Sequence, residues 1–476
     1  MKRKGSVVRV DHPIVQKKIE KSLDLSIKDG SLYSISSGFG LSYLSPFALV
    51  LNATSSQIGI LYAIMSLLPG IVQVKASELI RKFSRKKIVL QSVMVQILLW
   101  IPIILTGVLF YMGVPYMIWV LIALIGLLYV FSAIAHPAWF SWMGSLIPEE
   151  RRGKYFAKRN RVMGFFGLIA MILGAIILDS MKRVGISEGN ILGWTLLGFG
   201  ILFVLAALTR LGSWTLLTGQ YEPRLKVRKK DGFSFRQFLK VAPSTPFGRF
   251  ALFRGAFSIA IGIAGPFWAV YMLRDLGFSY MWFMGITVSG IVFQLLFLPL
   301  LGKASDRFGN VRIMGICSGL IFIAPFLWIA STWISSDLGV KIYLLFVPAI
   351  VSGFAFAGYN LATNNYVYDA VSVQKRGFGV SYMNLLVGIG TFVGASIGSL
   401  IALVGVSFMN SVLFIFLISG VSRFLVAVFG IKYLREVRHV KKFSSHYLIK
   451  EFRPMQGIVR EVNYLGHLVK KVEHYI

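Results

Sequence analysis

The sequence predicts an all-α integral membrane protein whose twelve transmembrane helices form two pseudo-symmetric six-helix bundles. Three observations support this fold class: an apolar composition, twelve apolar runs of membrane-spanning length, and an internal repeat that relates the two halves of the chain. Parallel repeats of this kind are how many transporters place a binding site near the middle of the membrane.

The composition and the apolar runs indicate a membrane protein. Of the 476 residues, 56% are hydrophobic and 14% are charged, and the mean hydropathy is +0.71. Soluble domains have an apolar share of roughly 45–50%, and a bilayer span needs about 20 mostly apolar residues. The predicted spans are 33–53, 56–74, 88–111, 115–139, 163–179, 192–217, 250–273, 279–301, 313–333, 342–366, 380–404 and 410–432.

The two halves repeat one another at matching positions. The stretch R-G-K-Y-F-A-K-R-N, which begins at Arg152, corresponds to R-G-F-G-V-S-Y-M-N, which begins at Arg376. The paired positions are Arg152 with Arg376, Gly153 with Gly377, Asn160 with Asn384, Gly164 with Gly388, and Gly174 with Gly398. A polar and basic break near 218–249 separates six spans from six, as a duplicated bundle requires.

These features divide the chain into five segments. We expect a basic cytoplasmic N-terminus, a first six-helix bundle, a cytoplasmic linker, a second six-helix bundle and a basic cytoplasmic tail. In that order, the segments are 1–30, 31–218, 219–249, 250–432 and 433–476.

The formal net charge of +31 is concentrated on one side of the predicted membrane. The termini, the linker and the loops after spans 2, 4, 8 and 10 are basic, whereas the opposite loops hold only Lys182, Arg183, Arg274 and Lys341. Under the positive-inside rule, this asymmetry places both termini in the cytoplasm of a multi-pass protein of the cell membrane. Attraction to anionic membrane lipids accounts for the excess charge. Nucleic-acid readout modules are missing, so we expect no nucleic-acid partner.

The motif content argues against enzyme chemistry. The single cysteine, Cys317, rules out an internal disulfide and a cysteine metal cluster. No phosphate-binding G-x-x-x-x-G-K-[ST], H-E-x-x-H or G-x-S-x-G pattern occurs. We therefore expect no enzyme activity, cofactor or metal site, and no cleavable signal peptide.

Residues 14–28 are either a basic amphipathic helix on the inner leaflet or a soluble lead-in.

The loop between spans 8 and 9 carries the most specific motif, G-K-A-S-D-R-F-G-N-V-R, from Gly302 to Arg312. It resembles the signature G-x-x-x-D-R-x-G-R-R of the major facilitator superfamily, although Asn310 and Val311 stand where that family often has basic residues. The resemblance implies a conformational latch in which Asp306 engages the start of span 11 and is released when the helices move. The latch residues implied in this half are Gly302, Asp306, Arg307, Gly309, Arg312, Arg376 and Gly377.

The corresponding loop of the first half, 76–87, departs from the signature. Its Asp-Arg pair is replaced, Ser84 stands where a glycine is expected, and Glu78 supplies the acid if three residues are inserted before Phe83. The loop between spans 4 and 5 resembles the family pattern P-x-x-x-R-G through Arg152 and Gly153. The alternative for both signature loops is that they are topology signals only. The resemblance covers residues 30–432 and implies the superfamily's fold without indicating the cargo.

In the fold that the resemblance implies, spans 1, 4, 7 and 10 line a central path. Span 10 concentrates amides and phenols near its cytoplasmic third, and unpaired amides are costly in lipid, so these groups should face the bundle interior. The repeat matches Asn360 of span 10 with His136 of span 4. The alternative role for these groups is interhelical packing. The solute or gate candidates are His136, Arg254, Tyr359, Asn360, Asn364 and Tyr43.

The predicted spans contain several arginines and few acids. Snorkelling to the headgroups is the default interpretation of Arg210, Arg254 and Arg423. Arg254 has the best functional case, because a positive charge in span 7 would attract an anionic solute. Predicted spans 1, 4, 7 and 8 hold no carboxylate, so proton coupling would involve His136 or Asp369.

Small residues and prolines also recur in both halves. The glycines of spans 5 and 11 predict close helix packing; they are Gly164, Gly167, Gly174, Gly388, Gly390, Gly394 and Gly398. Pro46 and Pro266 lie at matching places near the outer ends of spans 1 and 7, where kinks would serve an outer gate.

The sequence thus predicts a secondary active or facilitative transporter that moves a small solute by alternating access of two six-helix bundles. The expected partners are a small-molecule solute and membrane lipids, and coupling to a proton or another ion is left open. We expect a monomer. The alternative function is a membrane sensor or lipid-handling protein that has the same fold and transports nothing.

Overall fold

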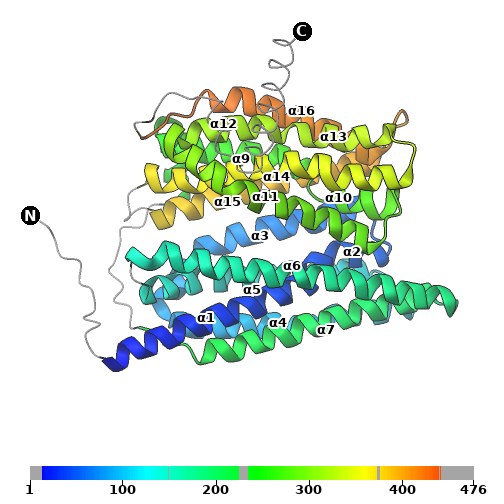
Figure 1. Cartoon of the computed structure of the whole chain (residues 1–476), viewed down its shortest axis with the longest axis horizontal. Helices are drawn as coiled ribbons and strands as arrows, with labels where there is room; N and C mark the ends of the chain where they lie inside the picture. The colour runs from blue at the N-terminus through cyan, green and yellow to red at the C-terminus, as the bar shows by residue number, and fades with distance from the viewer. Residues whose placement is uncertain (1–12, 148, 224–233, 372–375, 439, 441–476) are drawn as a thin grey trace, which may run out of the picture.

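The computed structural model describes residues 13–147, 149–223, 234–371, 376–438 and 440, and its regular elements there are all helices (Figure 1). The first half contains α1 (Pro13–Phe39), α2 (Leu44–Val50), α3 (Ser55–Lys82), α4 (Arg85–Tyr111), α5 (Met117–Leu146), α6 (Glu149–Ser187) and α7 (Ile191–Thr218). After α8 (Phe235–Val241), the second half contains α9 (Pro246–Ala264), α10 (Phe267–Val270), α11 (Tyr280–Phe308), α12 (Asn310–Ile321), α13 (Ile323–Ala330), α14 (Asp337–Ala370), α15 (Arg376–Val404) and α16 (Ser411–Ile431).

The predicted spans correspond to helices of membrane-crossing length. Within the described ranges, 11 helices are long and apolar enough to cross a bilayer. The first predicted span is the remaining one, and it consists of the end of α1, a single turn at Leu41–Tyr43, and α2. The prediction of an all-helical membrane bundle is therefore confirmed.

Local sequence signals cap the starts of eight of the described helices. Short polar side chains accept a hydrogen bond from the first turn and so satisfy one of its free N–H groups. At α3, Thr54 and Gln57 form a reciprocal capping box. The capping residues are Thr54, Ser84, Asn190, Ser234, Thr245, Ser279, Ser336 and Asn410.

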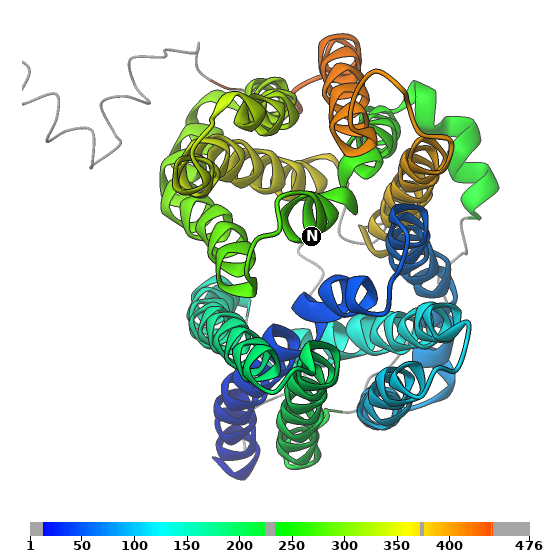
Figure 2. The same ribbon diagram turned by 90° about the vertical axis from the view of Figure 1, so that its right-hand side faces the viewer.

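The first helix of each half is broken near the same end of the bundle. In the first half, α1 ends at Phe39, and Pro46 lies in the first turn of α2. In the second half, α9 ends at Ala264, and Pro266 immediately precedes α10. The predicted kinks are present because proline removes a backbone donor and clashes with the preceding turn. Seen end-on in Figure 2, the short helices α2 and α10 lie in the middle of the molecule.

The bundle has a basic end and a far end, which hold different loops. The basic end holds the start of α1, the end of α7 and the α3–α4 and α11–α12 connections; the far end holds α2, α10 and the α6–α7 connection. Between the halves, α3 packs along α15, and α6 packs against α11. Within the halves, α1 packs on α6 and α7, as α9 packs on α15 and α16.

The helix α1 is longer than the predicted first span. Residues 14–28 form its first part, and Ser22, Ser26 and Asp29 are buried where α1 packs on α6 and α7. This segment therefore belongs to the helix bundle, and it is neither a separate helix on the membrane surface nor an unpacked lead-in. Burial of Ser22, Ser26 and Asp29 on one side of α1 accounts for the difference.

The glycines of α15 allow close approach to α9. A Cβ atom added at Gly390, Gly394 or Gly398 would lie 2.3, 2.1 or 2.4 Å from a backbone oxygen of α9. The prediction of close packing is confirmed for these glycines, and also for Gly174, where an added Cβ would lie 2.7 Å from the Tyr43 ring. It is wrong for Gly164, which has nothing within 4 Å of an added Cβ.

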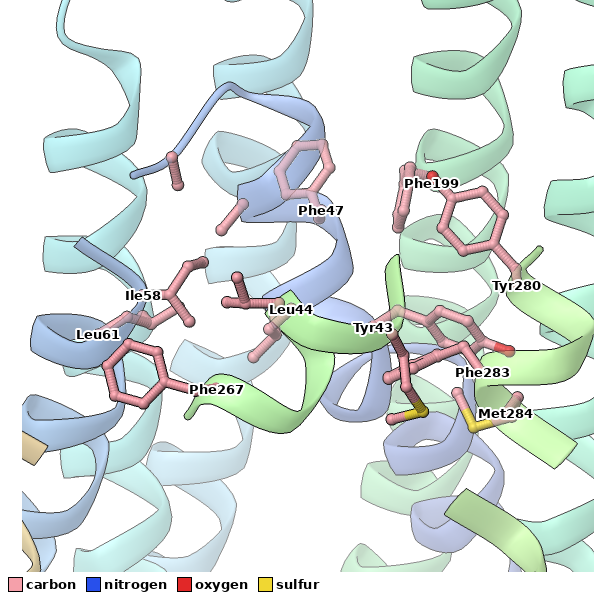
Figure 3. Close-up of a cluster of buried hydrophobic side chains, with 14 of the residues drawn as sticks. Tyr43, Leu44, Phe47, Ile58, Leu61, Phe199, Phe267, Tyr280, Phe283 and Met284 are labelled. Atoms are coloured by element: carbon pink, nitrogen blue, oxygen red, sulfur yellow. The ribbon is translucent and has the colours of Figure 1, made fainter. Parts of the chain in front are cut away.

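The apolar core differs at the two ends. One core at the far end contains residues of both halves, including Tyr43, Leu44 and Phe47 from the first half and Phe267 and Phe283 from the second (Figure 3). At the basic end, the first half has its own core around Trp142, and the second half has another around Tyr366. Among the described residues, the halves thus share one apolar core at the far end and have separate cores at the basic end, while α3 and α15 remain packed across the interface.

We predict that Gly394→Ala will lower the free energy of unfolding by about 1–3 kcal/mol, because the added methyl group overpacks the α9–α15 contact. The matched change Gly164→Ala adds the same atom to an open site and should be neutral or stabilising, by up to about 1 kcal/mol. Thermal unfolding of the purified variants measures both effects. Equal shifts for the two variants would contradict this account of the packing.

Candidate functional site

The amides of α14 lie on the inner face of the second half. On one side of α14, the rings of Tyr359 and Tyr366 pack on Phe257 and Phe250 of α9, with centroids 5.1 and 4.7 Å apart. On another side, Cβ atoms added at Gly358 of α14 and at Gly302 of α11 would lie 3.3 Å from Leu301 and 3.8 Å from Leu361. Asn360 and Asn364 lie between the two contact faces, and both are exposed.

His136 occupies the matching place on α5. It is exposed, and its ring stacks on Phe140 at a centroid distance of 6.5 Å. An added Cβ at Gly126 would lie 3.1 Å from Ile64, which places α3 on one side of His136. Tyr129 and Ser132, seven and four residues before His136 on the same face of α5, line a pocket together with residues of α1. His136 and Asn360 are therefore both exposed on matching inner faces of the two halves.

The other three solute or gate candidates are less exposed than His136 and Asn360: Tyr359 and Tyr43 are buried, and Arg254 is half-buried. Tyr359 is 4% exposed, and the Arg254 guanidinium carbon lies 5.7 Å from its ring centroid. Within the described chain, the buried Nε of Arg254 has no hydrogen-bond partner. Tyr43 is fully buried in the far-end core and donates its hydroxyl to the backbone oxygen of Met171 in α6. Tyr43 is therefore part of the far-end core.

Arg210 and Arg423 are buried, and the expectation that they snorkel is wrong. Arg210 is 8% exposed and Arg423 is 2% exposed. Arg210 donates to Gln96 and Ser213 inside the first half, and Arg423 donates to the backbone oxygen of Ile321 over 3.3 Å. Both cations therefore form hydrogen bonds inside the bundle, although the buried Nε of Arg423 has no partner among the described residues.

A pocket within the first half adjoins Arg210. It is lined by α1, α4, α5 and α7 through Tyr33, Ser36, Ser37, Leu41, Gln96, Trp100, Leu128, Tyr129, Ser132 and Arg210. The sequence analysis did not identify this site. The one available signal was the position of Gln96, a polar residue in the middle of an apolar span.

The α11–α12 connection turns sharply at Gly309. Its φ of +94° favours glycine, and an added Cβ would lie 2.3 Å from a carboxylate oxygen of Glu436. Asp306 is exposed on the last turns of α11, and Arg307 and Arg312 lie on either side of the turn. The predicted partner of Asp306 is the start of α15, where the side chains of Arg376 and Gly377 lie outside the described residues. The latch therefore stays a prediction.

The latch predicted in the first half also stays a prediction. Glu78 lies in α3, and Arg152 and Gly153 lie in α6. Their side chains are likewise outside what the structure describes.

A buried polar network lies beside the α11–α12 turn. Asn310 is fully buried and donates to Asp369 of α14 over 2.6 Å. Arg438 forms an ion pair with the same carboxylate over 3.1 Å, and Glu436 accepts from the Val311 backbone N–H over 2.9 Å. Asn310, which departs from the family signature, thus connects the turn to α14.

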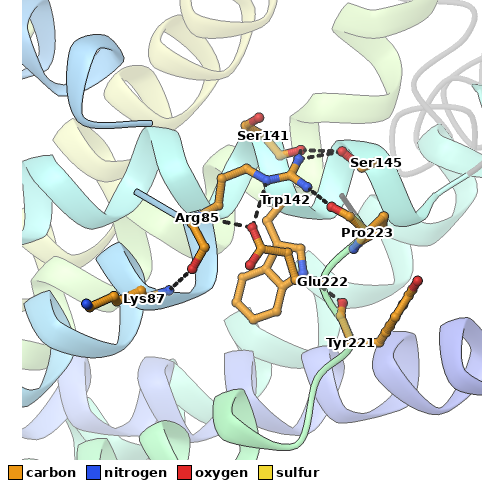
Figure 4. Close-up of polar contacts among 9 residues, drawn as sticks. Arg85, Lys87, Ser141, Trp142, Ser145, Tyr221, Glu222 and Pro223 are labelled. Carbon is orange, nitrogen blue, oxygen red and sulfur yellow. Dashed lines mark hydrogen bonds and ion pairs between the residues drawn. The ribbon is translucent and has the colours of Figure 1, made fainter. Parts of the chain in front are cut away.

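The first half contains a related network around Arg85 (Figure 4). Glu222, which follows α7, accepts from the Arg85 backbone N–H over 2.9 Å and from its Nε over 3.2 Å. The guanidinium group also donates to Ser141, Ser145 and Pro223. In both halves, a glutamate after the sixth span therefore caps the N-terminus of the third span, where the helix dipole favours a carboxylate.

Two polar contacts join the halves at the far end. The Asp179 carboxylate of α6 accepts from the backbone N–H groups of Tyr280 and Met281 at the start of α11, each over 2.9 Å. Arg274 donates to the backbone oxygen of Ala53 and, over 3.4 Å, to Ser55. These contacts surround the shared far-end core.

Comparison with known proteins agrees with this architecture. The family model of the Major Facilitator Superfamily matches residues 30–291 and 250–448, two overlapping matches that together span most of the chain. Among curated proteins, no sequence matches.

Several solved transporter structures share the fold. An auto-inhibited POT family peptide transporter is 12% identical, with a TM-score of 0.62 over 90% of this chain and 99% of that chain. The nucleoside transporter NupG is 15% identical, with a TM-score of 0.61 over 86% and 98% of the two chains. At these identities, the likeness concerns the fold alone.

A third similar structure is known in two states. A bacterial homologue of the iron transporter ferroportin in its inward-facing state is 15% identical, with a TM-score of 0.61 over 89% of this chain and 99% of that chain. The outward-facing state with soaked iron is 16% identical and has a TM-score of 0.50 over 86% and 98% of the two chains. The present structure is therefore more similar to the inward-facing state.

We predict that Glu222→Ala will lower the free energy of unfolding by roughly 3 kcal/mol, because it removes one partner of a buried ion pair. The Arg85 side chain is 2% exposed, so the cation would remain buried without a carboxylate. Glu188→Ala, at an exposed position near the far end, is the matched control and should change little. Chemical or thermal unfolding in detergent gives the comparison, and similar losses in both variants would refute the proposed role of Glu222.

Proposed function

The chain belongs to the major facilitator superfamily, and we propose that it carries a small solute across the cell membrane by alternating access between its two halves. Family membership makes it a multi-span membrane transport protein. The observation that supports the alternating-access mechanism is the arrangement of the apolar cores, one shared at the far end and two separate at the basic end.

The proposed orientation follows from the charge of the loops. If the basic end faces the cytoplasm, as the positive-inside rule favours, the structure corresponds to an inward-facing state. The far end is then the outer gate, built from the broken helices α2 and α10. The greater similarity to the inward-facing ferroportin homologue supports this assignment.

In this proposal, the solute lies between the inner faces of the two halves. His136 of α5 and the amides Asn360 and Asn364 of α14 supply hydrogen-bond donors and acceptors on these faces. Tyr43 belongs to the outer gate, because its ring is buried in the far-end core. The Asp306 latch would form when the basic end closes, and an exposed Asp306 is consistent with the inward-facing state.

We predict that a cross-link between cysteines introduced at Asp179 and Tyr280 will stop solute uptake into proteoliposomes, and that reduction will restore it. These residues contact each other across the far-end interface, so the link holds the outer gate closed. Each single-cysteine variant is the control for loss of the carboxylate or the ring. Uptake that continues in the cross-linked protein would exclude alternating access.

The same experiment separates the transporter from the alternative function. A membrane sensor or lipid-handling protein on this fold would bind its ligand but show no uptake in either redox state.

We predict that Asn360→Leu will weaken solute binding by about tenfold, because one hydrogen bond to a polar solute contributes about 1 kcal/mol or somewhat more. The control is Asn160→Leu, which changes the same residue type at an exposed helical position of α6. Binding is measured through thermal stabilisation by the solute, since a ligand that binds only the folded protein raises its stability. Unchanged affinity in Asn360→Leu would remove this residue from the proposed site.

A further inference from the structure

We infer that the first-half pocket beside Arg210 binds the carboxylate group of a small organic anion. This inference names the substrate class of the proposed transporter and so rests on the proposed function. The residues that carry it are Arg210 and Gln96, and neither was among the candidates that the sequence identified.

The buried charges beside the pocket do not balance. Arg210 donates to Ser213 over 3.1 Å, and Ser213 in turn donates to the Asp29 carboxylate over 2.5 Å. Arg159 lies 3.9 Å from the other oxygen of the same carboxylate. All three ionic side chains are nine-tenths buried or more. Among the described residues, two guanidinium groups therefore share one carboxylate, and the cluster carries at least one positive charge in excess.

An uncompensated cation in the bundle interior is costly unless an anion approaches it. Arginine has five donors and cannot lose its proton, so the charge persists at any physiological pH. Its planar group matches the geometry of a carboxylate or of a phosphate, both of which it can bind through two hydrogen bonds. The excess of one charge fits a singly charged ligand group.

Gln96 supplies an independent sign of an absent ligand. Its side-chain oxygen accepts from Arg210 at 3.0 and 3.3 Å, and because guanidinium has no acceptor, this fixes the amide orientation. The amide nitrogen is then left with no hydrogen-bond partner among the described residues. Gln96 is only 7% exposed and lines the pocket. A buried donor without an acceptor is rare and costs about 1–3 kcal/mol.

The pocket adjoins the surface on which the solute is proposed to lie. Ser132 and Tyr129 line it, and they precede His136 on the same face of α5. A ligand whose carboxylate enters the pocket would therefore extend toward His136 and the inner face of the other half. A cation or a divalent metal is disfavoured, because its positive charge would meet the Arg210 guanidinium.

The test uses the full-length protein in lipid nanodiscs and measures thermal unfolding with acetate, lactate and benzoate. Acetamide, lactamide and benzamide are the neutral counterparts, benzylamine is the cationic one, and inorganic phosphate tests a different anion. We expect at least one carboxylate to raise the unfolding temperature in a saturable way, and its amide to have no effect. Stabilisation by none of the three carboxylates, by the amides equally, or by phosphate alone would overturn the inference.

The decisive variant is Gln96→Glu. It keeps an oxygen for Arg210 but places a negative charge where the ligand carboxylate is proposed to bind. We expect carboxylate affinity to fall at least tenfold, while the unfolding temperature without ligand does not fall. Gln57→Glu makes the same change in the capping box of α3 and should leave affinity unchanged. If Gln96→Glu does not fold, Gln96→Leu removes the free donor without adding charge and should also weaken binding.

Uptake measurements separate this inference from the proposed function. If a carboxylate binds in a Gln96-dependent way but is not taken up into proteoliposomes, the site stands and transport fails. If a neutral solute is taken up and Gln96→Glu transports it normally, transport stands and the anion site fails.

Discussion

The two halves of the molecule share one apolar core at the far end and pack together along α3 and α15, whereas at the basic end each half has an apolar core of its own among the described residues. This difference organises the rest of the structure. The breaks in the first helix of each half bring α2 and α10 into the shared core, and proline at matching positions favours those breaks. Polar contacts from Asp179 and Arg274 surround the same core.

The surfaces on which helices pack closely differ from the surfaces that carry the exposed polar side chains. The glycines of α15 bring it against α9 within the second half, and Gly388 approaches the backbone of α3 across the interface. Such contacts depend on backbone shape and tolerate little added volume. The exposed amides of α14 and the imidazole of His136 instead lie on the faces between which we propose that the solute binds.

The capping glutamates and the buried arginines occupy corresponding positions in the two halves. Glu222 and Glu436 cap the third span of their respective halves, and Arg210 and Arg423 are both buried in the sixth. Only the first half brings a carboxylate, Asp29, into the cluster of its buried arginine among the described residues. The repeat thus preserves backbone capping, while the buried charge around each arginine has diverged.

The sequence by itself determined the helical membrane fold, the two related halves, the starts of eight described helices and the matching positions of His136 and Asn360, which are both exposed. These properties depend on local hydropathy, capping side chains and repeat spacing. Only the tertiary structure decided that Arg210 and Arg423 are buried, that Gln96 contacts Arg210 while Asp29 is linked to it through Ser213, and that Arg85 pairs with Glu222. Those partners lie on different helices, and periodicity within one helix does not specify which side chain of another helix it will meet. The sequence also cannot indicate which end is closed, because the two arrangements of the proposed alternating-access cycle contain the same residues.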